Sequence, residues 1–166
     1  MSIKDCAAPA FPYPSEQNGF LVEHVSLLRQ SLRELTGRDL VDKGLSCEQA
    51  AREIFEASFI VLSHSSAPDP ILTYGNLATL NLFEMTWDEL VAMPSRYTAE
   101  ELEREERACL LEKVAADGFM DDYSGIRIST SGRRFRIENA TVWNLRDVNG
   151  SYYGQAATFE TWTFLG

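Results

Sequence analysis

Hydrophobic and polar positions alternate along the last third of the chain and predict three consecutive antiparallel strands. The first strand covers residues 125–129, and turn residues at 130–132 connect it to a second strand at 134–146. A second turn, at 147–150, leads to a third strand at 152–164. That strand is apolar or aromatic on both sides, so we expect both faces of the sheet to be covered.

The middle strand carries polar residues among the aromatic ones on a single face. A strict period of two places these side chains together: Phe135, Ile137, Asn139, Thr141, Trp143 and Leu145. An unpaired buried amide or hydroxyl costs roughly 1–3 kcal/mol, so Asn139 and Thr141 require a partner. The backbone, Gln155, trapped water and a bound ligand are the alternatives that the sequence leaves open.

An amphipathic helix is predicted near the N-terminus, and Gly37 is placed to end it. Its apolar stripe, with alternating spacings of four and three, consists of Leu21, Val25, Leu28, Leu32 and Leu35. The stripe is shorter than a coiled coil requires, so packing on the sheet is favoured over a dimer seam. A homodimer through the Leu21 to Leu35 helix remains the alternative.

The middle of the chain predicts a hairpin surrounded by further helices. Ser46 begins a capping box that opens a second helix, and Asn76 and Thr86 are placed to cap two short ones. Short strands at 59–64 and 71–74 form the hairpin, with His64 at its solvated tip. A further capping box, Thr98-Ala99-Glu100-Glu101, is expected to open a longer helix that ends before Gly118. This helix should face inward through Leu102, Cys109, Leu110 and Val114. The whole pattern predicts an α+β fold: a five-stranded antiparallel sheet with helical segments on one face and an N-terminal helical extension.

The composition bounds the class of protein. With 166 residues, the chain is long enough for one ordinary domain with an added helical segment. Its formal net charge of −10 argues against sequence-independent nucleic-acid binding and against anionic membrane surfaces, so we expect neither partner. Neither a signal peptide nor an apolar run of membrane length is visible, so we expect a cytoplasmic protein.

The sequence shows neither a metal-binding nor a catalytic arrangement. Cys6, Cys47 and Cys109 are widely spaced, so no disulfide framework and no metal site is predicted. No nucleophile stands beside a base, and the adjacent carboxylates Asp121 and Asp122 are typical of a solvated loop. We therefore predict no catalytic residues and expect that the protein is not an enzyme.

Two stretches resemble known families. Residues 71–78 (Ile-Leu-Thr-Tyr-Gly-Asn-Leu-Ala) and 83–90 (Phe-Glu-Met-Thr-Trp-Asp-Glu-Leu) resemble the PAS pattern of a strand, an Asn and a short helix. A closer resemblance, to the PAS-related MEKHLA domain family, is carried by Gly118-Phe119, 125–129 (Gly-Ile-Arg-Ile-Ser), Gly132-Arg133, 137–143 (Ile-Glu-Asn-Ala-Thr-Val-Trp) and 159–162. This resemblance covers most of residues 55–164. Within the family, the chain resembles the free-standing bacterial members. The resemblance implies a fold and a sensory or regulatory role, and no reaction.

The resemblance also implies a division of the chain and a place for a ligand. We expect a flexible N-terminal arm (1–19), an N-terminal helical extension (20–58) and a PAS-like MEKHLA domain (59–166). PAS domains often hold a ligand between the sheet and the helical segments. The candidate ligand-binding residues are Phe83, Met93, Tyr97, Asn139, Thr141, Trp143 and Gln155.

Two cofactors of PAS domains can be examined in the same way. Ser95 stands where light-sensing flavin PAS domains carry the Cys that forms the flavin adduct, and a serine cannot form that thioether. Haem-binding PAS domains usually supply a His from the long helix, and residues 100–117 contain none. Noncovalent flavin stays open, so the sequence identifies no cofactor.

Two functions follow as hypotheses. The first is a cytosolic PAS-like sensory domain that binds a small, mostly apolar ligand between sheet and helices. It would signal through self-association or through a partner. The second is a ligand-free protein-interaction module that dimerises through the Leu21 to Leu35 helix and the aromatic-rich last strand.

Overall fold

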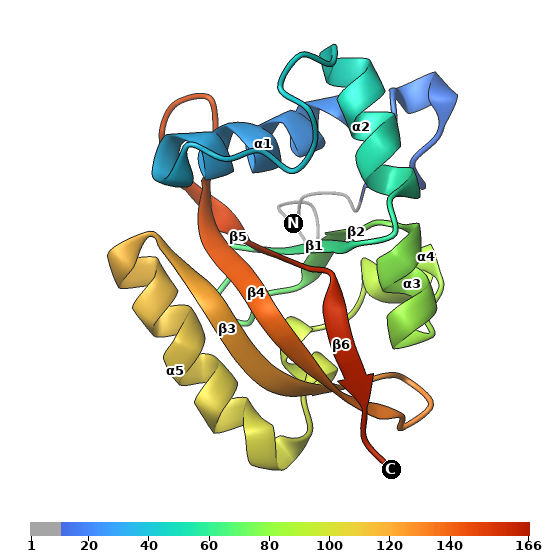
Figure 1. Cartoon of the computed structure of the whole chain (residues 1–166), viewed down its shortest axis with the longest axis vertical. Coiled ribbons are helices and arrows are strands. Elements are labelled where there is room, and N and C mark those ends of the chain that lie inside the picture. The colour runs from blue at the N-terminus through green and yellow to red at the C-terminus, as the bar shows by residue number, and fades with distance from the viewer. Residues whose placement is uncertain (1–10) are drawn as a thin grey trace, which may run out of the picture.

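The computed structural model describes residues 11–166, so the first ten residues of the predicted arm lie outside it. The helices are α1 (Val22–Thr36), α2 (Cys47–Glu56), α3 (Leu77–Phe83), α4 (Trp87–Leu90) and α5 (Glu101–Asp117), with the short 3-10 helices η2 (Glu16–Asn18) and η3 (Ser95–Thr98). The strands are β1 (Ile60–Ser65), β2 (Leu72–Gly75), β3 (Phe119–Ile128), β4 (Arg134–Arg146), β5 (Tyr152–Phe159) and β6 (Thr161–Phe164). Figure 1 shows α1 and α2 together at the top and α5 alongside β3 below them.

The sheet is antiparallel throughout, in the order β2-β1-β5-β4-β3. β4 is long enough to pair with β5 through its C-terminal half and with β6 through its N-terminal half. The register of β5 on β4 continues unchanged into β6, so the single strand predicted at 152–164 is interrupted only at Glu160. The predicted α+β fold is confirmed, with six strands where five were expected.

Helices cover both faces of the sheet, as two neighbouring residues of β4 demonstrate. The Trp143 indole donates to the Leu28 carbonyl in α1 at 3.1 Å, whereas the Asn144 amide donates to the Ala115 carbonyl in α5 at 3.2 Å. Successive side chains of a strand point to opposite faces. α1 therefore covers one face of the sheet, which we call the outer face, and α5 covers the other, the inner face.

The apolar stripe of α1 packs on the outer face. Val25 and Leu28 are fully buried and Leu32 is 3% exposed, while Leu35 at the end of the helix is 36% exposed. This is the packing that the spacing of the stripe favours. It leaves little apolar surface on α1 for the alternative, a dimer seam.

The predicted caps at Ser46, Thr86 and Asn76 are present. The first two side chains each accept a hydrogen bond from the backbone N–H three residues further on, at 3.2 Å. The Asn76 side chain caps α3 and is fully buried, and its amide donates to the carbonyls of Ile54 at 2.9 Å and Phe59 at 2.8 Å. This one amide therefore joins α2, the entry to β1 and the start of α3.

The cap predicted at Thr98 is wrong. Its hydroxyl donates to the Ser95 carbonyl at 2.7 Å, and α5 begins after Glu100 without a side-chain cap.

The described part of the predicted arm, residues 11–19, packs onto the body of the domain. The Trp87 indole donates to the Phe11 carbonyl at 2.8 Å, and the Tyr13 ring lies edge-on to the rings of Phe55 and Trp87. This segment lies against α2 and α4.

β4 does not keep the strict period of two that its sequence predicts, because Asn139 forms a β-bulge. Its φ is +52°, and the pairing with β3 shifts by one residue between Ile137 and Ala140. One extra residue in a strand moves every later side chain to the opposite face. Phe135 and Ile137, which precede the bulge, face inward. Thr141, Trp143 and Leu145, which follow it, face outward.

Two other irregularities belong to the same bulge. β3 carries an extra residue of its own at Asp122, where φ is +54°, and this restores the register between the two strands. The interruption of the last strand lies across from the bulge, since the register on β4 places Glu160 opposite Asn139. The bulge thus sets which residues of three neighbouring strands reach the inner face.

The left-handed backbone at Asn139 predicts a difference between two substitutions. Asn139→Val should lower the free energy of unfolding by about 1–2 kcal/mol, because β-branched residues are strained at positive φ. Asn139→Gly should change it by much less, since glycine adopts this conformation freely and the Asn139 side chain is exposed. Urea unfolding monitored by tryptophan fluorescence compares them. Equal stability of the two variants would contradict the bulge.

Candidate functional site

A cavity of about 60 Å³ lies between the inner face of the sheet and α5. Space of this size holds about four water molecules, or a ligand of about four to six non-hydrogen atoms. Its lining comes from all strands except β6 and from α3, η3 and α5: Leu62, Ser63, His64, Leu72, Phe83, Thr98, Arg107, Leu110, Leu111, Tyr123, Arg127, Ile137, Val142, Gln155, Ala156, Ala157 and Phe159. Most of these side chains are hydrophobic, so the polar ones stand out.

Two arginines line this cavity, Arg107 from α5 and Arg127 from β3. They are only 9% and 7% exposed, and within residues 11–166 neither forms an ion pair. Arg107 donates to Ser95 Oγ at 2.8 Å. Arg127 donates to the Ile126 carbonyl at 2.8 Å and to the Tyr123 hydroxyl at 3.2 Å. A guanidinium has five N–H donors, so most of this donor capacity has no partner in the described part of the chain.

The electrostatic character of the cavity is positive. Burial, together with the nearby charge of Arg127, lowers the pKa of Arg107 to about 10, so Arg107 is still protonated at neutral pH. The carboxylate connected to this pair is that of Glu106, which is exposed and is reached only through the Tyr123 hydroxyl, a donor to Glu106 at 3.0 Å. The cavity wall therefore holds two desolvated cations without an adjoining anion among the described residues.

His64 lines the same cavity, although its sequence context predicted a solvated position at a hairpin tip. β1 pairs with β2 on one side and with β5 on the other, where His64 faces Gln155, so His64 lies inside the sheet and is 8% exposed. Its Nδ1 lies 3.0 Å from the Ser65 carbonyl, and its buried Nε2 has no hydrogen-bond partner within residues 11–166. Burial lowers the pKa of His64 to about 4, which keeps the ring neutral at pH 7.

Two amides connect this cavity to α5. Gln155 of β5 and Asn144 of β4 face each other across the strand pair, and the Gln155 amide donates to Asn144 Oδ1 at 3.1 Å. The same amide donates to the Leu111 carbonyl at 3.0 Å, and Asn144 reaches the Ala115 carbonyl one turn further on. A side chain in the cavity wall is thus hydrogen-bonded directly to the backbone of the helix that covers it.

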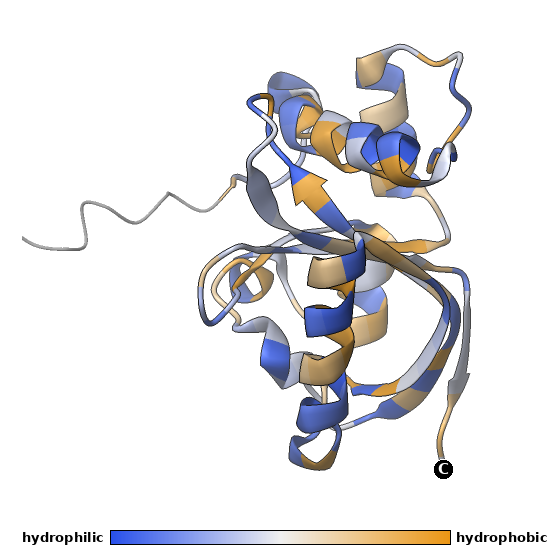
Figure 2. Cartoon of the chain, turned by 90° about the vertical axis from the view of Figure 1, so that its left-hand side faces the viewer, coloured by the Kyte–Doolittle hydropathy of each residue, from blue (hydrophilic) through white to orange (hydrophobic). Residues whose placement is uncertain are grey.

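The inner side of α5 differs from the predicted stripe. Leu110 and Val114 are buried, but Leu102 is 93% exposed and Cys109 is exposed. Arg107 precedes Leu110 by three residues and Val114 by seven, so it takes the inward position of the preceding turn. Figure 2, in which α5 faces the viewer, shows hydrophilic and hydrophobic bands alternating along the helix. Because Arg107 is charged and faces inward, the apolar residues of α5 do not show a clear helical period in the sequence.

The structure brings two of the seven predicted ligand-binding residues, Phe83 and Gln155, to the cavity. Met93 packs against the hydrophobic core without lining the cavity. Tyr97 is 47% exposed, and its ring carries the guanidinium of Arg96 at 4.5 Å. Neither residue lines the inner cavity.

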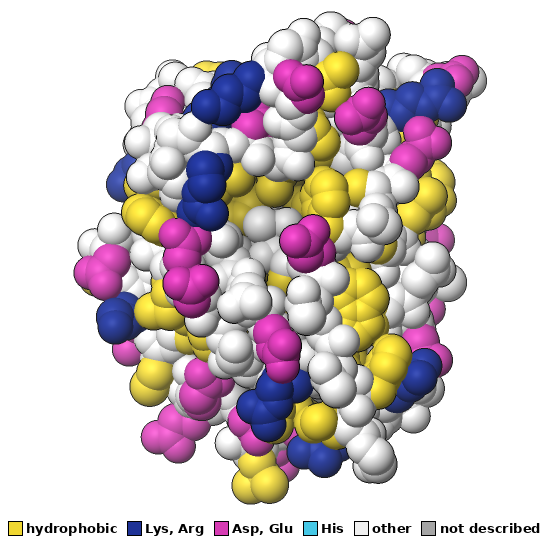
Figure 3. Space-filling view, in the orientation of Figure 1, with side chains coloured by type: hydrophobic (Ala, Val, Ile, Leu, Met, Phe, Trp, Pro, Cys, Tyr) yellow, Lys and Arg dark blue, Asp and Glu magenta, His cyan; other side chains and the backbone are white. Residues whose placement is uncertain are grey.

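The other three predicted residues lie on the opposite face, because they follow the bulge. Trp143 is fully buried under α1, and Asn139 and Thr141 line a wider cavity of about 310 Å³ between the sheet and the loop that joins α1 to α2. The Thr141 hydroxyl donates to Asp121 at 2.8 Å, and Asp121 pairs with Arg38 at 2.7 Å. Thr141 thus has a partner within the chain. Figure 3 shows this face, with hydrophobic side chains in a hollow across its middle.

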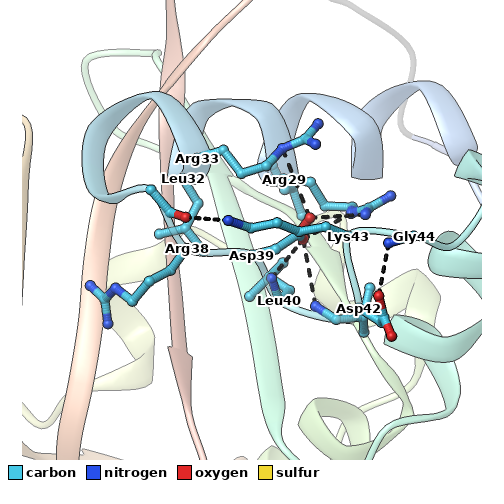
Figure 4. A network of polar contacts seen from close by, with 12 residues as sticks. Arg29, Leu32, Arg33, Arg38, Asp39, Leu40, Asp42, Lys43 and Gly44 are labelled. Carbon is cyan, nitrogen blue, oxygen red and sulfur yellow. Dashed lines mark hydrogen bonds and ion pairs between the residues drawn. The ribbon is translucent and has the colours of Figure 1, made fainter.

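A buried ion pair fixes the loop that borders this outer cavity (Figure 4). The Asp39 carboxylate accepts two hydrogen bonds from the Arg29 guanidinium, both at 2.9 Å, and one from the Leu40 backbone N–H at 2.7 Å. The side chains of Arg29 and Asp39 are 5% and 2% exposed. Burial acts to raise the pKa of Asp39, but the hydrogen bonds and charge of Arg29 outweigh it and hold this pKa below its usual value.

The candidate residues that sequence interpretation missed are Arg107, Arg127 and His64. The spacing of Arg107 from Leu110 and Val114 was a usable signal, since these three residues share one side of a helix. For Arg127 the signal was misleading, because alternation with Ile126 and Ile128 places arginine on the polar face. The structure instead buries Arg127 and leaves the two isoleucines partly exposed.

Comparison with known proteins identifies the family. The sequence pattern of the MEKHLA domain matches residues 22–164. The chain belongs to the MEKHLA domain family. The family resemblance read from the sequence is therefore confirmed, and the matched region of this MEKHLA domain begins at α1.

The relatives of this MEKHLA domain include much longer plant proteins. Homeobox-leucine zipper protein ATHB-9 of Arabidopsis thaliana is 28% identical over 173 residues, which cover 99% of this chain and 21% of that protein. Homeobox-leucine zipper protein REVOLUTA of the same plant is 25% identical over 144 residues, 83% of this chain and 17% of that protein. The MEKHLA chain thus spans about a fifth of the length of these curated relatives.

Solved structures show that the MEKHLA domain has a PAS-like fold. A PAS domain from Colwellia psychrerythraea matches with a TM-score of 0.60 at 12% identity, covering 71% of this chain and 95% of that one. A light-oxygen-voltage domain studied with a flavin analogue matches with a TM-score of 0.56 at 14% identity, covering 71% and 85%. A PAS domain from a two-component sensor histidine kinase gives 0.53 at 17%, covering 69% and 91%. At these identities the likeness concerns the fold alone.

The inner cavity does not fit a flavin. Pockets for ligands of that size occupy roughly 300–1,000 Å³, far above the 60 Å³ between the sheet and α5. Ser95, the residue expected at the adduct position, is buried and accepts the hydrogen bond from Arg107. Within residues 11–166, no three His, Cys, Asp or Glu side chains gather as metal ligands, and no helix is both long and apolar enough to cross a membrane.

Proposed function

We propose that this MEKHLA domain is a sensory module that binds a small ligand in the inner cavity, between the sheet and α5. The observation that supports this most directly is the buried polar lining of an otherwise apolar space. His64 Nε2 and most N–H groups of Arg107 and Arg127 have no partner within residues 11–166. Buried polar atoms are normally paired, so His64 Nε2 requires a ligand or ordered water, and the same molecule would accept from the free N–H groups of the two arginines.

The same contacts offer a route for a signal. Gln155 lines the cavity and donates a hydrogen bond to the Leu111 carbonyl of α5. A ligand that displaces Gln155 would therefore also disturb the packing of α5 on the sheet. The relatives are far longer than this chain, and we infer that the domain is a regulatory module that can be joined to a separate output. The alternative, dimerisation through the stripe of α1, has less support because that stripe is used on the sheet. Nothing in the cavity favours a catalytic role.

Ligand binding can be tested with a variant that fills the cavity. Ala157 lies on β5 between Leu62 of β1 and Val142 of β4, and all three line the cavity. A library of metabolite-sized compounds should contain members that raise the melting temperature of the wild-type protein. Ala157→Leu should abolish these shifts, because its added carbons occupy a space that holds only about four waters.

The matched control is Ala108→Leu, which adds the same atoms at an exposed position of α5. It should respond to the compounds as the wild type does. The proposal fails if no compound shifts the wild-type protein and native mass spectrometry finds no bound small molecule. It also fails if Ala157→Leu binds the same compounds equally well.

A further inference from the structure

The charge at the inner cavity restricts the class of ligand, provided that the cavity is the ligand site proposed above. Arg107 and Arg127 belong to different elements, yet both line the same small space, and the charge of Arg127 acts on Arg107. Burying a charged group without a counter-charge is costly, so an isolated pair of like charges is an unusual way to line a cavity. An anion between them would supply the missing acceptor.

Most of the remaining cavity lining is apolar, so a purely polar ligand would fit it poorly. Leu110 and the inward side chains of Ile137 and Val142 provide an apolar wall next to the two guanidinium groups. A ligand suited to both parts has a charged end and a short hydrocarbon end. The guanidinium fork matches the two coplanar oxygens of a carboxylate, with two parallel N–H···O bonds.

We propose that the inner cavity binds a short-chain organic carboxylate, with its carboxylate held by Arg107 and Arg127 and its hydrocarbon end against Ile137 and Val142. The volume of about 60 Å³ limits the ligand to about four to six non-hydrogen atoms, the size of acetate, propionate or butyrate. The Arg107 hydrogen bond to Ser95 keeps one edge of its guanidinium directed at η3. Binding would therefore connect η3, α5 and β3 through one carboxylate.

The test uses propionate and its neutral isostere propionamide on the full chain, at constant ionic strength. Calorimetric titration should detect propionate and give no measurable affinity for propionamide. Arg107→Met and Arg127→Met should each weaken propionate binding by about 10- to 100-fold, because each removes charge-assisted hydrogen bonds. Arg96→Met is the matched control: Arg96 is a half-buried arginine paired with Asp69 outside the cavity, and its loss should leave the affinity unchanged.

Each contrary result has a distinct meaning. Equal affinity for propionate and propionamide would overturn anion recognition while leaving ligand binding in place. Tighter, arginine-dependent binding of phosphate or sulfate would overturn the carboxylate class. If acetate, propionate and butyrate all fail to bind, the inference is wrong. In that case the proposed function, binding of some small ligand, still stands if compounds from the library bind the wild-type protein and Ala157→Leu abolishes their binding. Should an arginine-to-methionine variant fail to fold, the propionate and propionamide comparison on the wild type still decides.

Discussion

Replacing Asp39 with Asn should lower the free energy of unfolding by about 3–5 kcal/mol. The substitution keeps the shape of the side chain but removes the charge that pairs with Arg29, whose side chain is only 5% exposed. The guanidinium would then stay buried with one hydrogen bond lost and no counter-charge. Chemical denaturation, monitored by tryptophan fluorescence and by far-ultraviolet circular dichroism, measures the change.

Two further variants separate this explanation from a general loss of stability. Glu56→Gln breaks the exposed pair with Arg52 and should have a much smaller effect, because solvent screens surface pairs. The double variant Arg29→Met with Asp39→Leu should recover much of the loss, because it removes both buried charges together. If Asp39→Asn costs no more than Glu56→Gln, the pair does not hold the loop between α1 and α2.

Acidification from pH 7 to pH 4 should destabilise the domain by about 3 kcal/mol for each of its two histidines. Burial lowers the pKa of His24 and of His64 from 6.5 to about 4 in the folded protein. Below pH 6.5 the unfolded chain takes up protons that the folded protein does not, so stability falls as the pH falls. Between pH 6 and pH 5 the slope should approach about 1.4 kcal/mol per pH unit for each histidine.

The contribution of each ring can be assigned with single substitutions. His24→Gln and His64→Gln should each reduce the pH dependence between pH 7 and pH 5 by about half, whatever they do to stability at pH 7. His24 lies in α1, with its ring nitrogens 3.0 Å from Ser63 Oγ and 3.3 Å from the Tyr153 hydroxyl. His64 lies on the inner face. A wild-type stability that stays flat over this range would show that neither ring is buried in the neutral form.

Local signals predicted most of the framework correctly. The caps at Ser46, Asn76 and Thr86 are encoded by short-range hydrogen bonds, which depend on a few neighbouring residues and so are visible in sequence. The packing of α1 followed from the length and spacing of its apolar stripe. The sequence predicted one antiparallel sheet that joins the hairpin to the later strands, but no local pattern specified the order of the strands in it.

The candidate site was predicted poorly because its geometry depends on one residue that breaks the strand period. Asn139 looks like any polar residue of an alternating strand, yet its positive φ moves Thr141 and Trp143 to the outer face. The buried arginines were missed for a related reason. Propensity and periodicity treat a charged residue as solvated, and only the tertiary structure reveals that Arg107 and Arg127 meet on the inner side of the sheet.

The paired bulges at Asp122 and Asn139 also constrain how the gene can vary. Loss of a single codon at either place would move the later side chains of that strand to the opposite face of the sheet. Residues that line the cavity would then point away from it. Loss of both codons would preserve the match between β3 and β4 but would leave Glu160 without the residue that it faces on β4. Length variation should therefore have been inherited in coupled steps, so that family members either keep all three extra residues, at 122, 139 and 160, or lack all three.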